Sequence, residues 1–153
     1  MVQYAGQALI RPAVSSDVAA ITAIASASFA HYVSRIGQPP APMIADYAAL
    51  VNACSAYVFE DEAILGYLVL EPLQDAMLLD IVAVFPDAQG RGVGKALMVS
   101  AEKQTRAAGL STIRLYTNAL MHENVGLYAK IGYAETGRKT ENGFDRIYME
   151  KRL

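Results

Sequence analysis

Three glycines and two cations form the group of residues best suited to binding an anion. Gly90, Gly92 and Gly94 alternate with Arg91 and precede Lys95, between an apolar stretch and an amphipathic one. The first turn of a helix leaves N–H groups unpaired and carries the positive end of the helix dipole. Glycines let a ligand approach the backbone closely, and Arg91 and Lys95 add positive charge. The spacing therefore predicts a phosphate-binding turn that opens a helix.

Two common phosphate loops do not fit this turn. A Walker A loop needs a glycine five residues before the Gly-Lys pair and a serine or threonine after it, where this chain has Gln89 and Ala96. A G-x-G-x-x-G fingerprint that starts at Gly90 ends on Lys95, and a start at Gly92 also lacks the third glycine. A P-loop and a Rossmann dinucleotide site are therefore disfavoured.

A third pattern fits the chain at two places. The turn Gln89–Gly94 reads Q-G-R-G-V-G after the apolar stretch Ile81–Pro86, and it resembles the pyrophosphate loop of the GNAT N-acetyltransferase superfamily, which binds coenzyme A. The segment Asn124–Tyr133 is similar to the L-Y-x-K-x-G-F/Y block of many members. The order of expected elements resembles this family from about residue 9 to 153. One departure is Met121, where the family often has asparagine.

The resemblance implies acetyl-CoA as co-substrate and assigns roles to several residues. Tyr128 would protonate the departing thiolate, and Asp80 would orient or deprotonate the acceptor amine. His31 and Tyr32, with Arg35 beside them, would line the acceptor cleft. Ordinary core or surface roles remain the alternative for each of these side chains. The cofactor-binding residues implied by the resemblance are Val82, Ala83, Val84, Gln89, Gly90, Arg91, Gly92, Val93, Gly94, Lys95 and Asn124.

The resemblance implies an N-acetyltransferase that acts by direct attack of a primary amine, on a small molecule or a protein amino group. Two alternatives stay open: a non-catalytic acyl-CoA-binding sensor or regulatory module, and a transferase for a longer acyl-CoA. The sequence shows no Cys/His/carboxylate spacing typical of a metal site, so we expect no metal. A homodimer is left open by the resemblance.

Bulk composition sets further limits. The 153 residues suit a single domain over 1–153, and 54% hydrophobic residues can fill its core. A net charge of −2 argues against a nucleic-acid partner, and no apolar run approaches the ~18 residues of a membrane span. The lone Cys54, expected to be buried or half-buried, allows no internal disulfide. With no secretory pattern in Met1–Gly6, we expect a cytoplasmic protein without a membrane partner.

Hydrophobic periodicity and turn residues predict the elements that must position these groups. We expect a mixed α/β fold in which about four helices flank a mostly antiparallel sheet of six to seven strands, with the strands on either side of the glycine turn's helix parallel. Val93, Leu97, Ala101 and Ala108 are expected to form the apolar stripe of that helix. The expected strands are Leu9–Pro12, Ala56–Glu60, Ala63–Glu71, Ala76–Val84, Thr112–Thr117, Tyr133–Arg138 and Phe144–Met149. The expected helices lie from about Val18 to Phe29, Ile44 to Ala53, Val93 to Ala108 and Glu123 to Ile131, with a loop over Ile36–Pro42.

Overall fold

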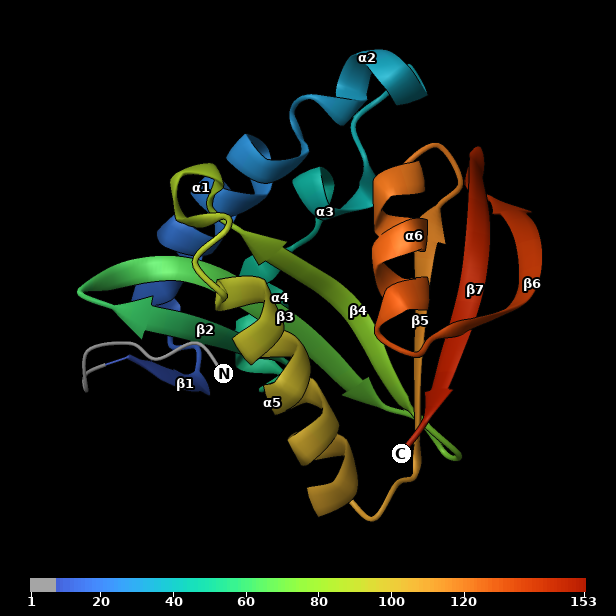
Figure 1. Cartoon of the computed structure of the whole chain (residues 1–153). Coiled ribbons are helices and arrows are strands. Elements are labelled where there is room, and N and C mark those ends of the chain that lie inside the picture. Colours follow the sequence, from blue (N-terminus) through green and yellow to red (C-terminus); the bar gives the residue numbers. More distant parts are fainter. Residues whose placement is uncertain (1–7) are drawn as a thin grey trace. The chain divides into compact units, whose positions relative to one another are not determined.

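The computed structural model describes residues 8–153, so the segment Met1–Gly6 that was read for a secretory signal lies outside the described residues. In residues 8–153 the chain forms seven strands, six α-helices and two short 3-10 helices, with the strand order β1-β2-β3-β4-β5-β7-β6 (Figure 1). The expected mixed α/β class is confirmed. The strands are β1 (Leu9–Pro12), β2 (Ala56–Asp61), β3 (Ala63–Pro72), β4 (Met77–Val84), β5 (Thr112–Asn118), β6 (Ala134–Glu141) and β7 (Phe144–Arg152). The helices are η1 (Ser15–Asp17), α1 (Val18–Phe29), α2 (Tyr32–Ile36), α3 (Ala41–Ile44), α4 (Tyr47–Asn52), η2 (Pro86–Ala88), α5 (Val93–Ala107) and α6 (His122–Lys130).

The described residues form two compact units. The first takes its described residues from 8–70 and 81–101, and the second consists of Glu71–Asp80 and Glu102–Leu153. Strands β3 and β4 and helix α5 each continue from one unit into the other. Each unit has its own apolar core, and each is described separately below.

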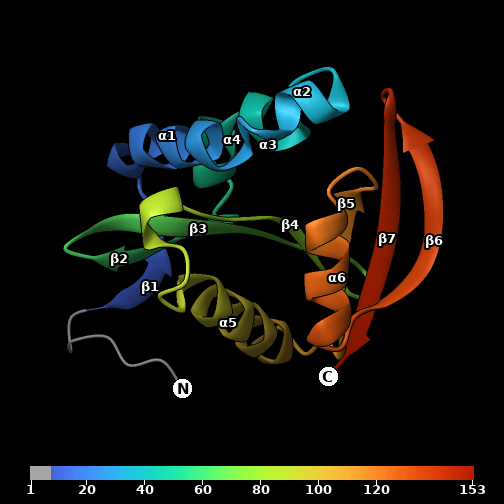
Figure 2. The same ribbon diagram turned by 45° about the horizontal axis from the view of Figure 1, so that its top comes forward.

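In the first unit, helices cover both faces of an antiparallel group of strands. β1 pairs with β2 and β2 with β3, with α1 and α4 on one side of these strands and the first half of α5 on the other (Figure 2). α5 approaches β3 closely at Gly66, where an added Cβ would lie 3.0 Å from both the Ala83 carbonyl oxygen and Val93 Cγ1. Glycine is therefore what permits the helix to dock at this point.

The apolar stripe of α5 follows the expected spacing over most of its length. Val93, Leu97 and Ala101 are fully buried. The prediction for Ala108 is wrong, because the helix ends at Ala107 and Ala108 is exposed. Thr105, one helical turn beyond Ala101, is buried in its place. Both positions would lie on the face of Ala101 in a continuous helix, but α5 ends at Ala107, so only Thr105 is still helical and packs there.

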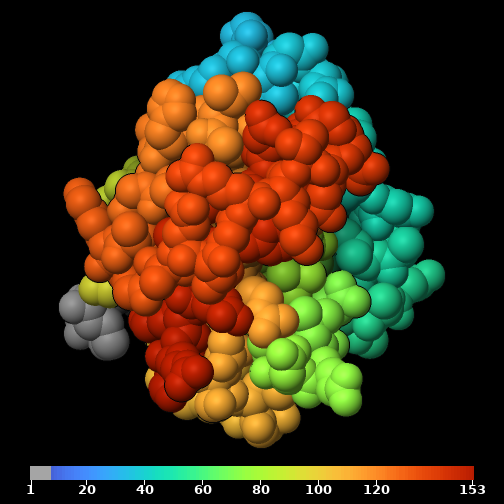
Figure 3. Space-filling view, turned by 90° about the vertical axis from the view of Figure 1, so that its right-hand side faces the viewer, coloured from blue at the N-terminus to red at the C-terminus, as the bar shows by residue number. Residues whose placement is uncertain are grey.

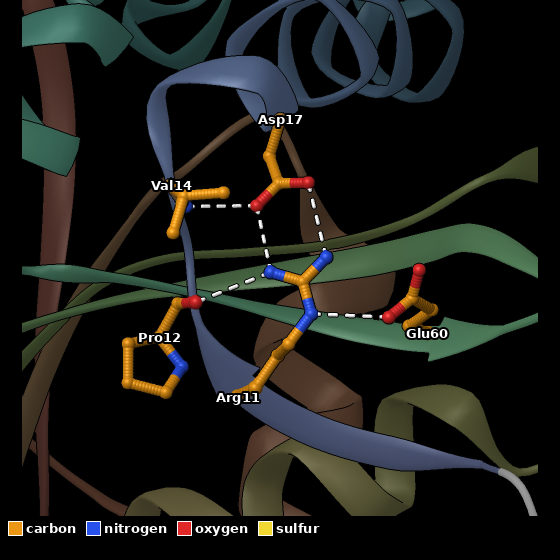
Figure 4. Close-up of polar contacts among 5 residues, drawn as sticks. All are labelled: Arg11, Pro12, Val14, Asp17 and Glu60. Atoms are coloured by element: carbon orange, nitrogen blue, oxygen red, sulfur yellow. Dashed lines mark hydrogen bonds and ion pairs between the residues drawn. The ribbon is translucent and has the colours of Figure 1, made fainter.

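A partly buried ion pair holds the start of α1 to the strands of the first unit (Figure 4). Arg11 donates from Nη1 and Nη2 to the two carboxylate oxygens of Asp17 at 2.8 and 3.1 Å, and from Nε to Glu60 at 3.0 Å. Asp17 also accepts from the Val14 backbone N–H at 2.8 Å. The guanidinium holds the pKa of the Asp17 carboxyl below its usual range. This network links β1, β2 and η1.

The second unit is built on one parallel and two antiparallel strand pairs. Met77–Leu79 of β4 pairs in parallel with Ile113–Leu115 of β5, as expected for strands joined through a helix. β5 pairs with β7 and β7 with β6, and Asn142-Gly143 turns with φ of 52° and 79° between them. Two positive φ angles are typical of a type I′ hairpin turn. β6 is the last strand in the pairing order, and its mostly exposed side chains belong to the surface shown in Figure 3.

The number of helices, the first residue of α4 and the exposure of Cys54 differ from expectation. α2 and α3 are extra helices of five and four residues, at either end of the predicted Ile36–Pro42 loop. α4 begins at Tyr47, later than the predicted Ile44, because the Asp46 side chain accepts from the Ala49 N–H and caps the helix there. Cys54 is exposed, against the expected burial, because it turns outward with φ of 59° after α4.

Candidate functional site

Three hydrogen bonds fix the position of the end of β4 in the first unit. The Val84 carbonyl oxygen accepts from the Ser28 hydroxyl at 2.8 Å and from Gln89 Nε2 at 3.4 Å. The next N–H, that of Phe85, donates to the Leu65 carbonyl at 2.8 Å. Both polar groups of the Val84–Phe85 peptide are therefore occupied. A ligand running along β4 is left with main-chain groups that precede this peptide.

The side chains of this part of β4 behave as ordinary core residues. Ala83 is buried, and Val82 and Val84 are half-buried. The predicted cofactor contacts on β4 would therefore have to be made by main-chain groups and not by side chains. The serine that fixes the strand end, Ser28, was missed from the sequence because a small hydroxyl residue in an apolar helix carries no recognisable pattern.

The glycine turn connects β4 to α5 with the backbone conformation that its residues predict. After η2 and the extended residue Gln89, Gly90 and Gly92 have φ of 81° and 83°, in the left-handed region that favours glycine. The first backbone bond of the helix runs from the Ala96 N–H to the Gly92 carbonyl at 3.0 Å. The N–H groups of residues 93–95 therefore precede the helical ladder and lie at its positive end.

The space around this turn admits a ligand close to the backbone. A Cβ at Gly90 would meet no atom within 4 Å, and one at Gly94 would meet only Val84 Cγ2 at 3.5 Å. Gln89, Arg91 and Lys95 are exposed, so two cations lie beside the helix N-terminus. Backbone donors, positive charge and an uncovered approach are together what a diphosphate requires. Residues 89–95 fit the pyrophosphate end of a coenzyme A.

In the second unit, Asp80 accepts a hydrogen bond from another strand. The Tyr116 hydroxyl donates to Asp80 Oδ1 at 2.7 Å. Burial and the neighbouring carboxylate raise the pKa of Tyr116, so its hydroxyl stays protonated as the donor. Asp80 is half-buried and is therefore neither a surface residue nor a helix cap. Tyr116 was missed because the register between β4 and β5 is a property of the fold.

Tyr128 lies on α6, half-buried, with its ring against another tyrosine. Its ring centroid is 5.9 Å from that of Tyr133, in an edge-to-face arrangement. The Tyr133 hydroxyl is buried and has no hydrogen-bond partner among residues 8–153, and burial raises its pKa. The Tyr128 carbonyl accepts from the N–H groups of Ile131 and Tyr133, which closes the end of the helix. Tyr133 thus supports α6 and the ring of Tyr128.

Asp80 and Tyr128 lie on opposite faces of the strands in the second unit. Ile113 pairs with Lys151, so their side chains share a face. The turn after α6 is on that face, since a Cβ at Gly132 would lie 3.1 Å from Lys151 Cε. Tyr116, three residues after Ile113, points to the opposite face and takes Asp80 as its partner. The structure therefore does not bring the two predicted catalytic side chains into contact.

The remaining predicted residues occupy local clusters. Asn124 lies in the first turn of α6, where its Nδ2 is 3.7 Å from the sulfur of the buried Met121. In the first unit, the buried ring of Tyr32 lies between the exposed His31, at 3.9 Å between centroids, and the Arg35 guanidinium, 5.1 Å from the Tyr32 centroid. These contacts define a small aromatic and cationic surface at α2.

Residues 8–153 contain neither a metal-binding cluster nor a membrane-spanning helix. No group of three His, Cys, Asp or Glu side chains is arranged to hold a metal ion. None of the helices in this range combines the length and the apolar character that crossing a bilayer demands.

Comparison with known proteins identifies the family. The family model described as "Acetyltransferase (GNAT) family" matches residues 18–133. A mycothiol acetyltransferase of Paenarthrobacter aurescens (strain TC1) is 43% identical over 53 residues, which is 35% of this chain and only 16% of that protein's length. A GCN5-related N-acetyltransferase structure from Rhodopseudomonas palustris has 26% identity and a TM-score of 0.77, over 99% of both chains. The PaiA N-acetyltransferase of Thermoplasma acidophilum, solved with coenzyme A, has 18% identity and a TM-score of 0.74, over 96% of this chain and 99% of that one. The chain belongs to the acetyltransferase (GNAT) family.

Proposed function

We propose that this chain is an acetyl-CoA-dependent N-acetyltransferase that acetylates a primary amine on a small molecule or a protein. The observation that carries the proposal is the turn with positive φ at Gly90 and Gly92 before the N-terminus of α5. Family membership and the structural neighbour that holds coenzyme A support the choice of ligand. The proposal extends the acetyltransferase domain over residues 1–153.

The proposed cofactor contacts are mostly made by the main chain. The N–H groups of residues 90–95 donate to the diphosphate, with Arg91 and Lys95 beside it. The thioester arm then follows β4 along the main-chain groups of Val82 and Ala83 and the Val84 N–H, because the Val84 carbonyl already accepts from Ser28 and Gln89. Asn124, at the first turn of α6, stays a proposed cofactor contact.

The acceptor must lose a proton before it can attack. Deprotonating a lysine-like amine with a pKa near 10.4 at pH 7 costs roughly 4.6 kcal/mol of free energy. Asp80 is the proposed group that attracts and orients the ammonium, and its bond from Tyr116 fixes the carboxylate for this task. His31 and Tyr32 on α2 are the proposed further acceptor contacts.

The proposed reaction forms one bond and breaks one. The amine nitrogen bonds to the acetyl carbon, the carbon–sulfur bond breaks, and the amine gives up one proton while the sulfur gains one. Strand N–H groups near Val82 or Val84 would stabilise the oxyanion. Tyr128 would give the thiolate its proton, since a phenol with a pKa near 10 is protonated at neutral pH.

The opposite faces of Asp80 and Tyr128 are compatible with these two roles. The attacking nitrogen and the departing sulfur approach and leave the acetyl carbon from different sides. An amine oriented on one side of the strands and a proton donor for sulfur on the other therefore need no contact with each other. Each group can be tested independently of the other.

The experiment that tests the function measures free thiol. The protein is incubated with acetyl-CoA and a panel of amines, amino acids, polyamines and peptides, and released CoA is quantified. Release that depends on one acceptor class supports the proposal. Tight binding of acetyl-CoA without release for any acceptor would instead identify the non-catalytic acyl-CoA-binding module. A parallel series with longer acyl-CoA donors tests the second alternative.

The setting of the protein is also part of the proposal. A cytoplasmic location fits the single cysteine, Cys54, because a reducing compartment does not require disulfides. A homodimer is proposed on the family relationship. Sedimentation of the purified protein measures its oligomeric state, and a measured mass of one chain at micromolar concentration would contradict the proposed homodimer.

A further inference from the structure

Two tyrosines lie side by side on the Asp80 face of the second unit. Tyr116 pairs with Tyr148 across β5 and β7, and their ring centroids are 5.6 Å apart. The Tyr116 hydroxyl donates to Asp80, and the Tyr148 hydroxyl donates to Glu141. Because each phenol hydrogen is directed at a carboxylate, both hydroxyls are held in fixed positions. The two carboxylates keep capacity to accept further hydrogen bonds.

A guanidinium covers one of these rings. The Arg146 guanidinium carbon lies 4.6 Å from the Tyr116 centroid and 5.7 Å from the Phe144 centroid, and the side chain is 13% exposed. Its ion pair within the described part of the chain, to Glu141, spans 3.9 Å, which is longer than a hydrogen bond. A guanidinium that lies over aromatic rings can still donate hydrogen bonds from the N–H groups at its edge to an anion that lies in the plane of the guanidinium. Arg146 also interacts with the Tyr148 hydroxyl. It is thus a nearly buried cation whose carboxylate partner, Glu141, lies beyond hydrogen-bond distance.

Opposite charges therefore lie at the two ends of one side chain. Asp80 contacts the hydroxyl of Tyr116, and Arg146 lies over its ring. The second carboxylate oxygen of Asp80 accepts no hydrogen bond from residues 8–153, and the side chain is half-buried. The two charges therefore contact different parts of one phenol side chain. Such an arrangement suits an amine and an anion that several bonds separate.

We propose that this face selects an acceptor amine that carries an anionic group several bonds from the reacting nitrogen. Asp80 receives the ammonium end, and Arg146 binds the carboxylate or phosphate at the other end. The inference rests on the proposed function, because it names the substrate class of the same reaction. A free amino acid with a distal amine and a peptide amine near an acidic side chain share this chemistry.

The test compares acceptors of equal length that differ at one end. These are 6-aminohexanoate, hexylamine and 1,6-diaminohexane, with a short peptide that has glutamate at its second position as the other source of the same chemistry. The measured quantity is the ratio of kcat/KM for 6-aminohexanoate to that for hexylamine. We expect a ratio on the order of 10 or more, since a charge-assisted hydrogen bond is lost with hexylamine. The diamine should be the poorest acceptor, because its second ammonium faces Arg146.

Four variants locate the preference. Arg146→Met should reduce the ratio by about 10-fold or more, whereas Arg146→Lys should keep part of it. Arg152→Met is the matched control, because Arg152 is an exposed cation on the same strand, and its ratio should stay within about 2-fold of wild type. Glu141→Gln should raise the ratio, since it removes the carboxylate that competes for Arg146.

The outcomes separate the inference from the proposed function. No CoA release with any acceptor would overturn both. Release with hexylamine and 6-aminohexanoate at equal kcat/KM, or an unchanged ratio in Arg146→Met, would overturn the inference and leave the transferase standing. If Arg146→Met does not fold, an unchanged ratio in Glu141→Gln overturns it instead. If the peptide is a better acceptor than 6-aminohexanoate, and both are better than hexylamine, the inference stands and the peptide is identified as the source of the anion.

Discussion

Replacing Gly94 by alanine should move stability and ligand affinity in opposite directions. Gly94 is in the first turn of α5 without a positive φ, and its added Cβ would make only an ordinary contact with Val84 Cγ2 at 3.5 Å. Alanine is a better helix former than glycine, by about 0.5 kcal/mol so near a helix end. The melting temperature should therefore rise by about 1–2 °C.

The same methyl group would occupy the space that the proposed diphosphate needs. Loss of one or two charge-assisted hydrogen bonds, each worth about 1.5–3 kcal/mol, should weaken acetyl-CoA binding by about 10- to 100-fold or more. Calorimetric titration measures the affinity, and circular dichroism measures the melting temperature. Gly126→Ala is the control, because Gly126 is also helical and open and should gain stability without losing affinity. A more stable Gly94→Ala protein with wild-type affinity would refute the reasoning.

Four further variants test other parts of the account. Gly92→Val should abolish the thermal stabilisation that CoA gives, because a β-branched residue resists φ of 83°, and a retained shift would place the ligand elsewhere. Tyr128→Phe should lower kcat more than acetyl-CoA affinity, whereas Tyr133→Phe, which removes an unpartnered buried hydroxyl, should raise stability by about 1 kcal/mol with kcat unchanged. Equal kcat in the two variants would remove Tyr128 from the mechanism. Asp17→Asn should cost about 2 kcal/mol at pH 7, measured by urea unfolding. Because the pair with Arg11 lowers the pKa of Asp17, its stabilisation is complete above the ordinary value of 3.8 and fades as pH falls through the lower folded pKa, so the two proteins should converge in strong acid. If the Asp17→Asn protein were still less stable than wild type in strong acid, the ion-pair explanation would be contradicted.

The glycine turn and α5 could be predicted because their signals are local. The positive φ at Gly90 and Gly92 and the buried Val93 and Leu97 follow from residue type and spacing within a few positions. The hairpin at Asn142-Gly143 is predictable for the same reason. By contrast, α2 and α3 are too short for a helical period to appear, and proline lies inside the first turn of α3.

The side-chain pairs that shape the candidate site could not be predicted. Ser28 and Val84 are 56 residues apart, and Tyr116 and Asp80 are 36 residues apart. Only the docking of α1 and the register of β4 with β5 bring them together. Sequence spacing carries information about one element at a time, and such contacts depend on how elements are placed. The resemblance indicated residues 89–95 as the proposed cofactor turn, whereas the partner of Asp80 and the position of Arg146 over Tyr116 required the structure.

The most direct test of the account is to follow backbone amides while CoA is added. In a ¹⁵N-labelled sample, the amide signals of Gly90, Gly92 and Gly94 should shift more than those of Gly37, Gly109 and Gly126. CoA should shift them more than pantetheine, which lacks the diphosphate. The account would be contradicted if CoA bound while these three signals stayed in place, or if pantetheine shifted them equally.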